Sequence, residues 1–310
     1  MTENRITLAA FMIVIYAVII GFTDNFVRVI ADEAGLWQFH LTRSVMALTI
    51  LGLVAGPLGL RIRPVNLGAV VARSLIHGLA MVIYFGALGF LPVAMAAAGL
   101  FTAPIFVLLI SRLAYGEVIG TVGILAVITG FAGAVLVLGP EAWSGVWSGV
   151  WSGASLAALL PVVAGAFYAM GNIATRKWCP QESAETLLAG FFLALGGFGL
   201  IGTLLLWAYP MTPSLGMAAF LQRGPVWPGS DFWFWTFVQA SGSLLGVGLM
   251  VRAYQLADAT RVSVFEYVIL PASALWTWVL WGEGLTGLAI AGMGLIVLAG
   301  LMIALGPRQG

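Results

Sequence analysis

Charge and cysteine are what this sequence has least of. Only 8% of its 310 residues are charged, whereas 61% are apolar. A soluble domain carries roughly 25% charged residues, so this chain cannot cover itself with a soluble surface and belongs in a lipid bilayer. The single cysteine, Cys179, excludes an internal disulfide and any cysteine-based metal cluster.

Several catalytic and nucleotide-binding motifs are also missing. The sequence has no G-x-x-x-x-G-K-[ST] motif, which excludes an ATP-driven pump, and no H-E-x-x-H or paired D-x-x-x-D motif. No Ser/His pair supports an intramembrane enzyme. We therefore expect no enzymatic activity, no cofactor and no metal. Carboxylates near mid-membrane are nearly absent, so facilitated movement of a substrate fits as well as exchange.

The apolar runs are long and continuous, which predicts transmembrane helices rather than the alternating strands of a barrel. The first run reads as a retained helix and not as a cleaved signal peptide, because Asp24, Asn25 and Arg28 end it and no clear A-x-A site follows. We expect an all-α integral membrane protein with ten helices, over residues 7–27, 36–56, 68–90, 93–111, 119–138, 155–175, 185–208, 232–254, 262–281 and 286–305.

The positive charges test this count. With the N-terminus inside, the outside segments hold only Arg28 and Arg223, and Arg43 lies within a span. The other ten basic residues all fall in cytoplasmic segments, as the positive-inside rule requires. We expect both termini in the cytoplasm.

The sequence contains an internal repeat, because its two halves share the same features in the same order. In each half a short polar corner leads into an apolar run with a central proline, Pro104 or Pro271, and the run ends in Gly-Glu, at Glu117 or Glu283. Five helices per copy make the second copy enter the membrane from the opposite side, which is an inverted repeat and is typical of alternating access. The other possibility is a duplicated helix bundle with no transport role. We expect repeats at 1–142 and 154–310.

The linker between the halves, residues 143–153, carries three tryptophans at a spacing of four. It reads either as an aromatic ligand box or, as we favour, as an external belt at the headgroup level. Residues 209–231 are rich in proline and glycine and predict an irregular external cap.

Polar residues inside spans are functional candidates because they are costly in lipid. His77 lies on one face of its helix with Arg73 and Tyr84; it is either a proton site or a partner in a hydrogen bond between helices. Arg73 is close enough to the inner interface to reach it. Arg43 is too deep for that and needs a partner, which is a substrate carboxylate, Asp24, Asp32 or Glu33.

Four further positions carry hydrogen-bonding groups. Glu266 lies one turn into the ninth helix, beside Arg261 and near Arg252, and is either part of an internal salt bridge or a functional carboxylate inside the span. Tyr168 and Asn172 share a face of the sixth helix, and Gln239 lies mid-way along the eighth, where small residues also predict close helix packing. For Tyr168, Asn172 and Gln239, a role in substrate binding and a role in the packing of helices both remain open.

The two repeat prolines and the two Gly-Glu ends are interpreted structurally. Pro104 and Pro271 each remove a backbone hydrogen bond inside a span, which predicts a kink that serves as a gate or stays static. Glu117 and Glu283 are interpreted as residues at helix ends rather than ligands.

At this point the chain resembles the ten-helix EamA type of the drug/metabolite transporter superfamily. The resemblance covers essentially all 310 residues and is best in ALGFLPVAMAAAGLFTAPIFVLLISRLAYGE and AYQLADATRVSVFEYVILPASALWTWVLWGE, each followed by a glycine-dotted helix. Arg43 also stands where such proteins often have arginine.

The resemblance implies a bacterial inner-membrane carrier with a central cavity that binds a small molecule. It implies that the cavity is lined by helices 1, 3, 4, 6, 8 and 9, with His77, Tyr84, Phe101, Tyr168, Asn172, Gln239, Trp276 and Trp278 as candidates. Relatives of this type export amino acids or move choline, vitamins and nucleotides. We expect an amino-acid exporter that works as a monomer or weak homodimer. The alternatives are an uptake carrier for a vitamin, cofactor or quaternary amine and, more remotely, an intramembrane enzyme or scaffold.

Overall fold

The computed structural model describes residues 5–87, 91, 93–139, 159–213 and 218–306. Within these residues all the regular structure is helical. The Trp-rich linker 143–153 lies outside them. The helices are α1 (Ile6–Asp24), α2 (Val27–Glu33), α3 (Leu36–Ala55), α4 (Leu67–Ala87), α5 (Val93–Leu100), α6 (Ala103–Tyr115), α7 (Thr121–Leu138), α9 (Leu160–Lys177), α10 (Ala184–Ala208), α11 (Ala218–Gln222), α12 (Ser230–Leu256), α13 (Ala259–Phe265), the 3₁₀ turn η2 (Glu266–Val268), α14 (Ile269–Trp281) and α15 (Gly287–Leu305).

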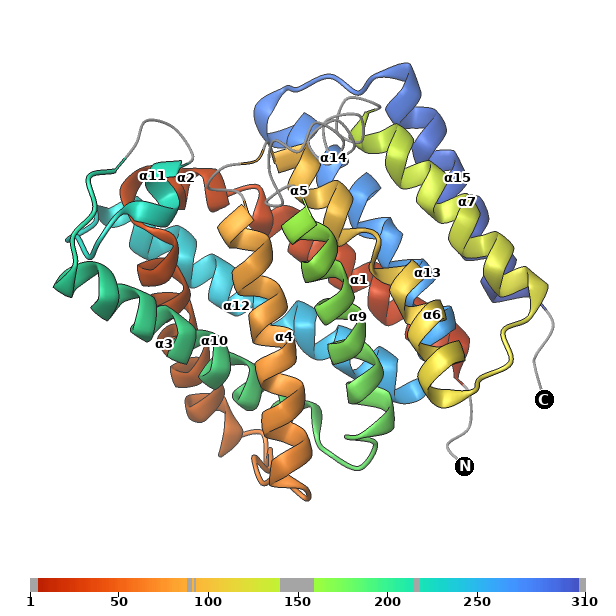
Figure 1. Ribbon diagram of the computed structural model, residues 1–310, viewed down its shortest axis with the longest axis horizontal. Coiled ribbons are helices and arrows are strands. Elements are labelled where there is room, and N and C mark those ends of the chain that lie inside the picture. Colours follow the sequence, from red (N-terminus) through yellow and green to blue (C-terminus); the bar gives the residue numbers. More distant parts are fainter. Residues whose placement is uncertain (1–4, 88–90, 92, 140–158, 214–217, 307–310) are drawn as a thin grey trace.

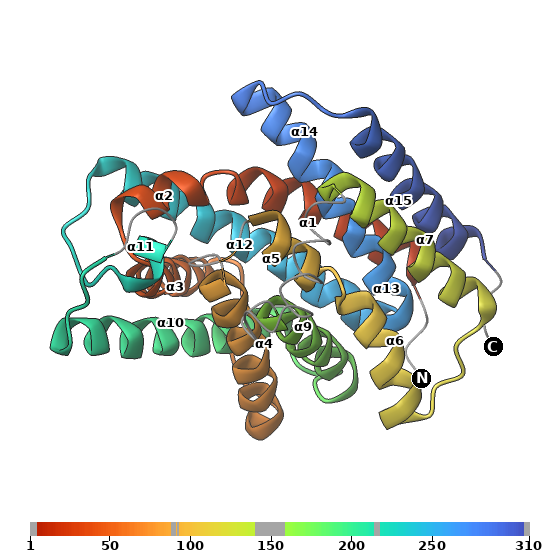
Figure 2. The same ribbon diagram turned by 45° about the horizontal axis from the view of Figure 1, so that its top comes forward.

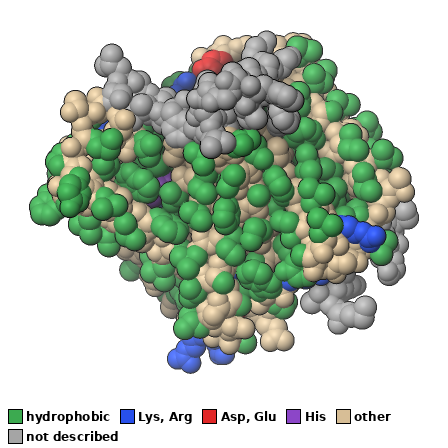
Figure 3. Space-filling view, in the orientation of Figure 1, with side chains coloured by type: hydrophobic (Ala, Val, Ile, Leu, Met, Phe, Trp, Pro, Cys, Tyr) green, Lys and Arg blue, Asp and Glu red, His purple; other side chains and the backbone are tan. Residues whose placement is uncertain are grey.

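The predicted all-α membrane architecture is confirmed. Nine of the helical segments in the described residues are long and apolar enough to cross a bilayer, with α1–α2, α5–α6 and α13–α14 each forming one span. The predicted sixth span, α9, is not among the nine, because its described part carries Asn172, Arg176 and Lys177 within 18 residues. It is enclosed by α4, α5, α6 and α12 instead. Hydrophobic side chains cover most of the visible face (Figure 3).

The main contacts between helices occur in equivalent pairs: each is repeated when the helices of the first half are exchanged with those of the second half. The second helix of each half packs on its counterpart, α3 on α10, and so does the fifth, α7 on α15. Helix α1 packs on α12 and α14 of the second half, just as α9 packs on α4, α5 and α6 of the first half. Figures 1 and 2 show α7 and α15 side by side at one end of the bundle. This exchange of partners is the pattern expected of two inverted repeats.

Glycines permit the closest helix contacts. A Cβ on Gly133 of α7 would lie 2.7 Å from the carbonyl oxygen of Gly292 on α15, and a Cβ on Gly292 would lie 2.6 Å from that of Gly133. The junction of α5 and α6 meets α9 in the same way, where Gly165 faces the carbonyl oxygen of Gly99 at 2.9 Å. The absence of a Cβ atom at these glycines therefore allows the helix backbones to come this close.

The repeat prolines follow helix breaks rather than bending continuous helices. The fourth span is interrupted at Phe101 and Thr102, and Pro104 lies in the first turn of α6. The ninth span passes through the η2 turn, and Pro271 lies in the first turn of α14. A proline is tolerated in a first turn because the N–H that it lacks would have no partner there. The expected kinks thus occur as short breaks at equivalent places in the two repeats.

The start of α1 and the end of α15 lie on one face of the bundle, which we call the terminal face (Figure 1). Starting from this face, α1 ends on the opposite face, and α9, in the second half, runs the reverse way and ends at Lys177 on the terminal face. Helices α1 and α9 therefore run in opposite directions through the bundle (Figure 1).

Candidate functional site

Polar side chains gather inside the bundle between α1, α3, α4, α9, α12 and the broken ninth span. They form two groups. The Asp24 cluster lies toward the opposite face and consists of Asp24, Arg43, Gln239 and Ser243. The Glu266 cluster lies toward the terminal face and consists of Tyr16, Tyr168, Asn172, Tyr254 and Glu266.

In the Asp24 cluster a neutral side chain stands between two opposite charges. The Gln239 Nε2 group donates a hydrogen bond of 2.7 Å to Asp24 Oδ1, and Arg43 Nη1 donates one of 3.4 Å to Gln239 Oε1. Ser243 Oγ donates to the same Oε1 at 3.1 Å. Arg43 is 5% exposed, and its Nε has no hydrogen-bond partner. Of the partners expected for Arg43, the structure places Asp24 closest to this role, through Gln239.

The Asp24 side chain is exposed although it lies inside the bundle. Its partner Gln239 is 0% exposed, and the guanidinium of Arg43 and the ring of Tyr84 are within electrostatic reach of its carboxylate. A carboxylate and a guanidinium thus lie on either side of one buried amide. This cluster can therefore offer a cationic partner and an anionic partner to one small molecule.

In the Glu266 cluster a carboxylate is enclosed by amide and phenol groups. Asn172 Nδ2 donates to Glu266 Oε1 at 3.3 Å. The hydroxyl of Tyr168 donates to the sulfur of Met250 at 3.0 Å and lies 3.4 Å from the hydroxyl of Tyr16. Glu266 is 6% exposed. The structure places Glu266 against Asn172 of α9 and the hydroxyl groups of Tyr168 and Tyr254.

Tyr16 links the two clusters along α1. Its hydroxyl meets Tyr168 and is within electrostatic reach of both Glu266 and Asp24. His77 packs edge-on against Tyr168 with ring centroids 4.8 Å apart, and its Nδ1 has no hydrogen-bond partner. Polar groups therefore continue from one cluster to the other through the core.

Arg73 does not reach the membrane interface as expected. It is 0% exposed. Its Nε donates to Thr175 Oγ1 at 2.9 Å, and its Nη1 donates to the carbonyl oxygen of Leu187 at 3.3 Å. The close packing of α4 on α9 and α10 leaves the side chain no path to water, so it joins these three helices instead.

The aromatic candidates divide between inside and outside. The Trp276 indole donates to the carbonyl oxygen of Val18 at 3.0 Å, so it faces α1. Phe101 lies at the break of the fourth span, 6.4 Å from the ring of Tyr267. Trp278 is 53% exposed, on the same stripe of α14 as the exposed residues Leu275 and Val279. We therefore leave Trp278 out of the proposed site.

Sequence reasoning gave no role to Tyr16 and Tyr254, and it treated Asp24 only as a possible neutraliser of Arg43. A tyrosine in the middle of the apolar run of α1 was the available signal for Tyr16. Tyr254 was harder to find, because it lies near the end of α12, where polar residues are ordinary.

One cavity among the described residues lies away from both clusters. Its volume is about 250 Å³, and it lies at the terminal face between the start of α7, the start of α13 and the end of α15. In the described part of the chain, no group of three or more His, Cys, Asp or Glu side chains is placed to hold a metal ion.

Comparisons with known proteins agree with this architecture. The EamA-like transporter family matches residues 7–139. The pseudopaline exporter of Pseudomonas aeruginosa is 26% identical over 92% of this chain and 93% of its own length. The riboflavin transporter of Vibrio cholerae is 27% identical over 67% of this chain and 61% of its own length.

A solved crystal structure shares the fold. It superposes with a TM-score of 0.74 over 96% of this chain and 98% of the other chain, at 18% sequence identity. The family match covers residues 7–139, and the alignment with the pseudopaline exporter continues through most of the rest of the chain. Residues 7–139 therefore match the EamA-like transporter family, and relatives that align over most of the chain are named as transporters.

Proposed function

We propose that this transporter exports small zwitterionic metabolites, amino acids first among them, by alternating access through the space between its two repeats. The observation that carries the proposal is the Asp24 cluster, in which a carboxylate and a guanidinium are held apart by one amide. The Glu266 cluster continues the polar route toward the terminal face.

The chemistry of a zwitterion fits this arrangement. Its ammonium group would bind the accessible carboxylate of Asp24, and its carboxylate would bind the unpartnered Nε of Arg43. Charge-assisted hydrogen bonds are about twice as strong as neutral ones. Gln239 accepts from Arg43 and donates to Asp24, so it holds both charges in place while the site is empty and can release either one to the substrate.

The repeats supply the motion. Inverted repeats provide two equivalent conformations, one open to each side of the membrane. The breaks before Pro104 and Pro271 lie at equivalent points in the spans that pack on α9 and α1. Rotation about these breaks would open one side and close the other.

The proposal also covers the membrane in which the protein lies and the side of that membrane that the terminal face occupies. We place the protein in the bacterial inner membrane as a monomer or weak homodimer, with the terminal face in the cytoplasm. The positive-inside distribution of arginine and lysine supports this orientation. It is tested by attaching a fluorescent reporter to the C-terminus.

Uptake of a vitamin, cofactor or quaternary amine is the second candidate. Relatives named as riboflavin transporters favour it, and so do aromatic pairs on the opposite-face side of α1. Phe26 stacks on Trp235 with ring centroids 3.4 Å apart, and Phe22 meets Trp276 at 5.0 Å. Such rings bind planar aromatic or cationic ligands.

Counterflow in proteoliposomes tests both candidates. Vesicles with the purified protein and a high internal concentration of one unlabelled compound receive the same compound in labelled form. We expect label to accumulate for methionine, threonine, phenylalanine or tryptophan, and not in protein-free vesicles. Accumulation of riboflavin or choline alone would replace export of amino acids by the second candidate. No flux of any compound, together with turnover of a lipid in detergent, would favour an intramembrane enzyme.

A conservative change in the Glu266 cluster tests the route toward the terminal face. Tyr168→Phe removes the hydroxyl that bonds Met250 and meets Tyr16. One hydrogen bond is worth about 1 kcal/mol, so we expect flux to fall about fivefold while thermal stability changes little. Tyr209→Phe, at a residue 76% exposed, is the matched control. An equal loss of flux in the two variants would remove Tyr168 from the route.

A further inference from the structure

Each repeat ends its broken span with the same three-residue motif, an aromatic residue, glycine and glutamate. Gly116 and Gly282 are the helix C-caps, with φ of 66° and 69°, in the left-handed region that favours glycine. The glycine ends the helix and turns the following glutamate, Glu117 or Glu283, away from the helix axis. The two motifs lie on opposite faces of the bundle because the repeats are inverted.

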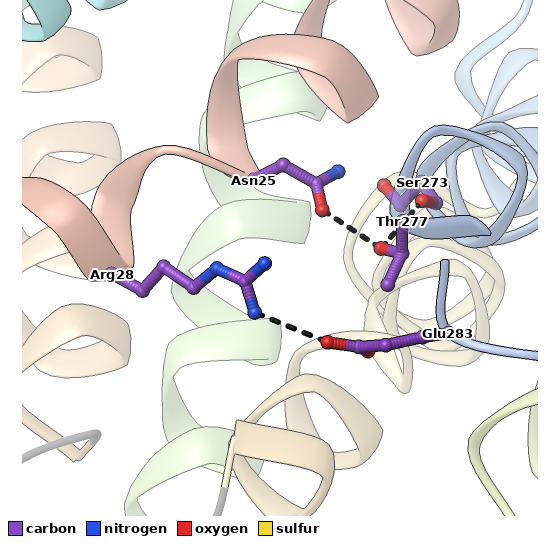
Figure 4. Close-up of polar contacts among 5 residues, drawn as sticks. All are labelled: Asn25, Arg28, Ser273, Thr277 and Glu283. Atoms are coloured by element: carbon purple, nitrogen blue, oxygen red, sulfur yellow. Dashed lines mark hydrogen bonds and ion pairs between the residues drawn. The ribbon is translucent and has the colours of Figure 1, made fainter. Parts of the chain in front are cut away.

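On the opposite face, the motif holds a cation from the first half. Arg28 Nη1 lies 3.1 Å from Glu283 Oε1 (Figure 4), and its guanidinium lies 3.5 Å from the centre of the Trp281 ring. Figure 4 also shows the hydroxyl of Thr277 donating to Asn25 Oδ1, at 2.8 Å. The end of α1 and the start of α2 are thus joined to the end of α14.

On the terminal face, the equivalent motif holds a cation from the second half. Lys177 Nζ lies 2.6 Å from Glu117 Oε1 and 5.3 Å from the centre of the Tyr115 ring. The indole of Trp178 also donates to the Tyr115 hydroxyl, at 3.0 Å. The end of α9 is thus joined to the end of α6.

The two contacts are equivalent under the exchange of the halves. In each, a cation at the end of a repeat's first span meets an aromatic residue and a glutamate at the end of the other repeat's fourth span. The chain has only 13 basic and 12 acidic residues, and four of these charged residues form the two equivalent pairs. Helix-end packing alone would need neither charge.

We propose that these contacts are the two gates of the transporter, one on each face, and that both are closed in this conformation. The inference rests on the proposed function, since only a carrier that works by alternating access needs equivalent closures on its two faces. Arg28 and Glu283 close the opposite face, and Lys177 and Glu117 close the terminal face. Passage of a substrate breaks one pair while the other stays formed.

The exposure of the pairs suits gates that open readily. The side chains of Arg28 and Glu283 are 47% and 58% exposed, and those of Lys177 and Glu117 are 35% and 29% exposed. Water and salt screen such pairs, so each contributes little to stability. Loss of one pair should therefore shift the balance between closed and open by up to about fivefold without unfolding the protein.

Charge reversal with hydrogen–deuterium exchange tests the proposal on the full-length protein in nanodiscs. Arg28→Glu is expected to raise exchange by up to about fivefold at the ends of α1 and α14, with no rise at the ends of α6 and α9. Lys177→Glu is expected to do the converse. Restoring the attraction, by Arg28→Glu with Glu283→Arg or by Lys177→Glu with Glu117→Lys, should return exchange toward wild type. Arg63→Glu, at an exposed residue on the terminal face, is the control.

Three results would overturn the gates: exchange unchanged by either reversal, exchange raised on both faces by one reversal, or no return in the swapped pairs. None of these measurements needs a substrate. Exchange that follows the expected pattern in a protein without counterflow would keep the gates and overturn the proposed substrates. Normal counterflow with unaltered exchange would keep the transport and overturn the gates.

Discussion

Asp24→Asn is expected to lower flux about a hundredfold. The asparagine keeps the shape of the side chain and can still accept from Gln239, but it removes the only charge in the Asp24 cluster that attracts an ammonium group. Loss of one partner from a hydrogen-bonded charge pair costs about 2–5 kcal/mol, and each 1.4 kcal/mol is a factor of ten. Initial rates of counterflow at low substrate concentration measure the loss.

The control for this variant is Asp32→Asn. Asp32 is also an exposed acidic residue, in α2, and the hydrogen bond recorded there uses its backbone carbonyl, which accepts from Arg223. We expect its flux to match wild type. A normal rate for Asp24→Asn, in protein of normal melting temperature, would show that the substrate does not use this carboxylate and would remove the main support for a zwitterion.

Gly165→Val is expected to destabilise the protein by about 3 kcal/mol. A Cβ at this position of α9 would lie 2.8 Å from Thr102 Oγ1, 2.9 Å from the carbonyl oxygen of Gly99 and 3.1 Å from that of Leu100. Two of these atoms are backbone, so the break in the fourth span would have to move away from α9. Overpacking of a close contact typically costs 1–3 kcal/mol. The melting temperature and the yield of monodisperse protein measure the effect.

Gly197→Val separates the contact from the cost of valine in a helix. Gly197 lies in α10 with no atom within 4 Å of its Cβ position, so the isopropyl group that valine adds there starts in open space. We expect its melting temperature to stay near that of wild type. Equal losses in the two variants would mean that the junction between α9 and the fourth span can relax, and that Gly165 does not determine its geometry.

Hydropathy located the helical spans because a bilayer imposes one demand along the whole chain. Every backbone N–H and C=O in lipid must find a partner within the segment, so an apolar run becomes a helix whatever it packs against. The prolines marked the fourth and ninth spans for the same local reason. Their breaks were predicted as kinks because sequence alone cannot say which carbonyls find other partners.

The partners of the polar side chains were not predictable in the same way. Glu266 was considered as a partner of an arginine near it in sequence. In the structure it accepts a hydrogen bond from Asn172 of α9, which is 94 residues away. Glu117 and Glu283 read as plain helix ends, because the cations that face them are 60 and 255 residues away. Such pairs form only when helices from the two halves come together.

By itself the sequence determined that this chain is a membrane protein and that its spans are helical, and it predicted that the same unit occurs twice in opposite orientations. These properties follow from local hydropathy and from counting spans. Only the tertiary structure decided that Gln239 lies between Asp24 and Arg43 and that Arg73 is buried between helices. It also decided that each of the two Gly-Glu ends pairs with a cation of the other half. The reason is physical: a helix forms within its own segment, whereas the free energy of a buried polar contact depends on side chains brought from distant parts of the chain.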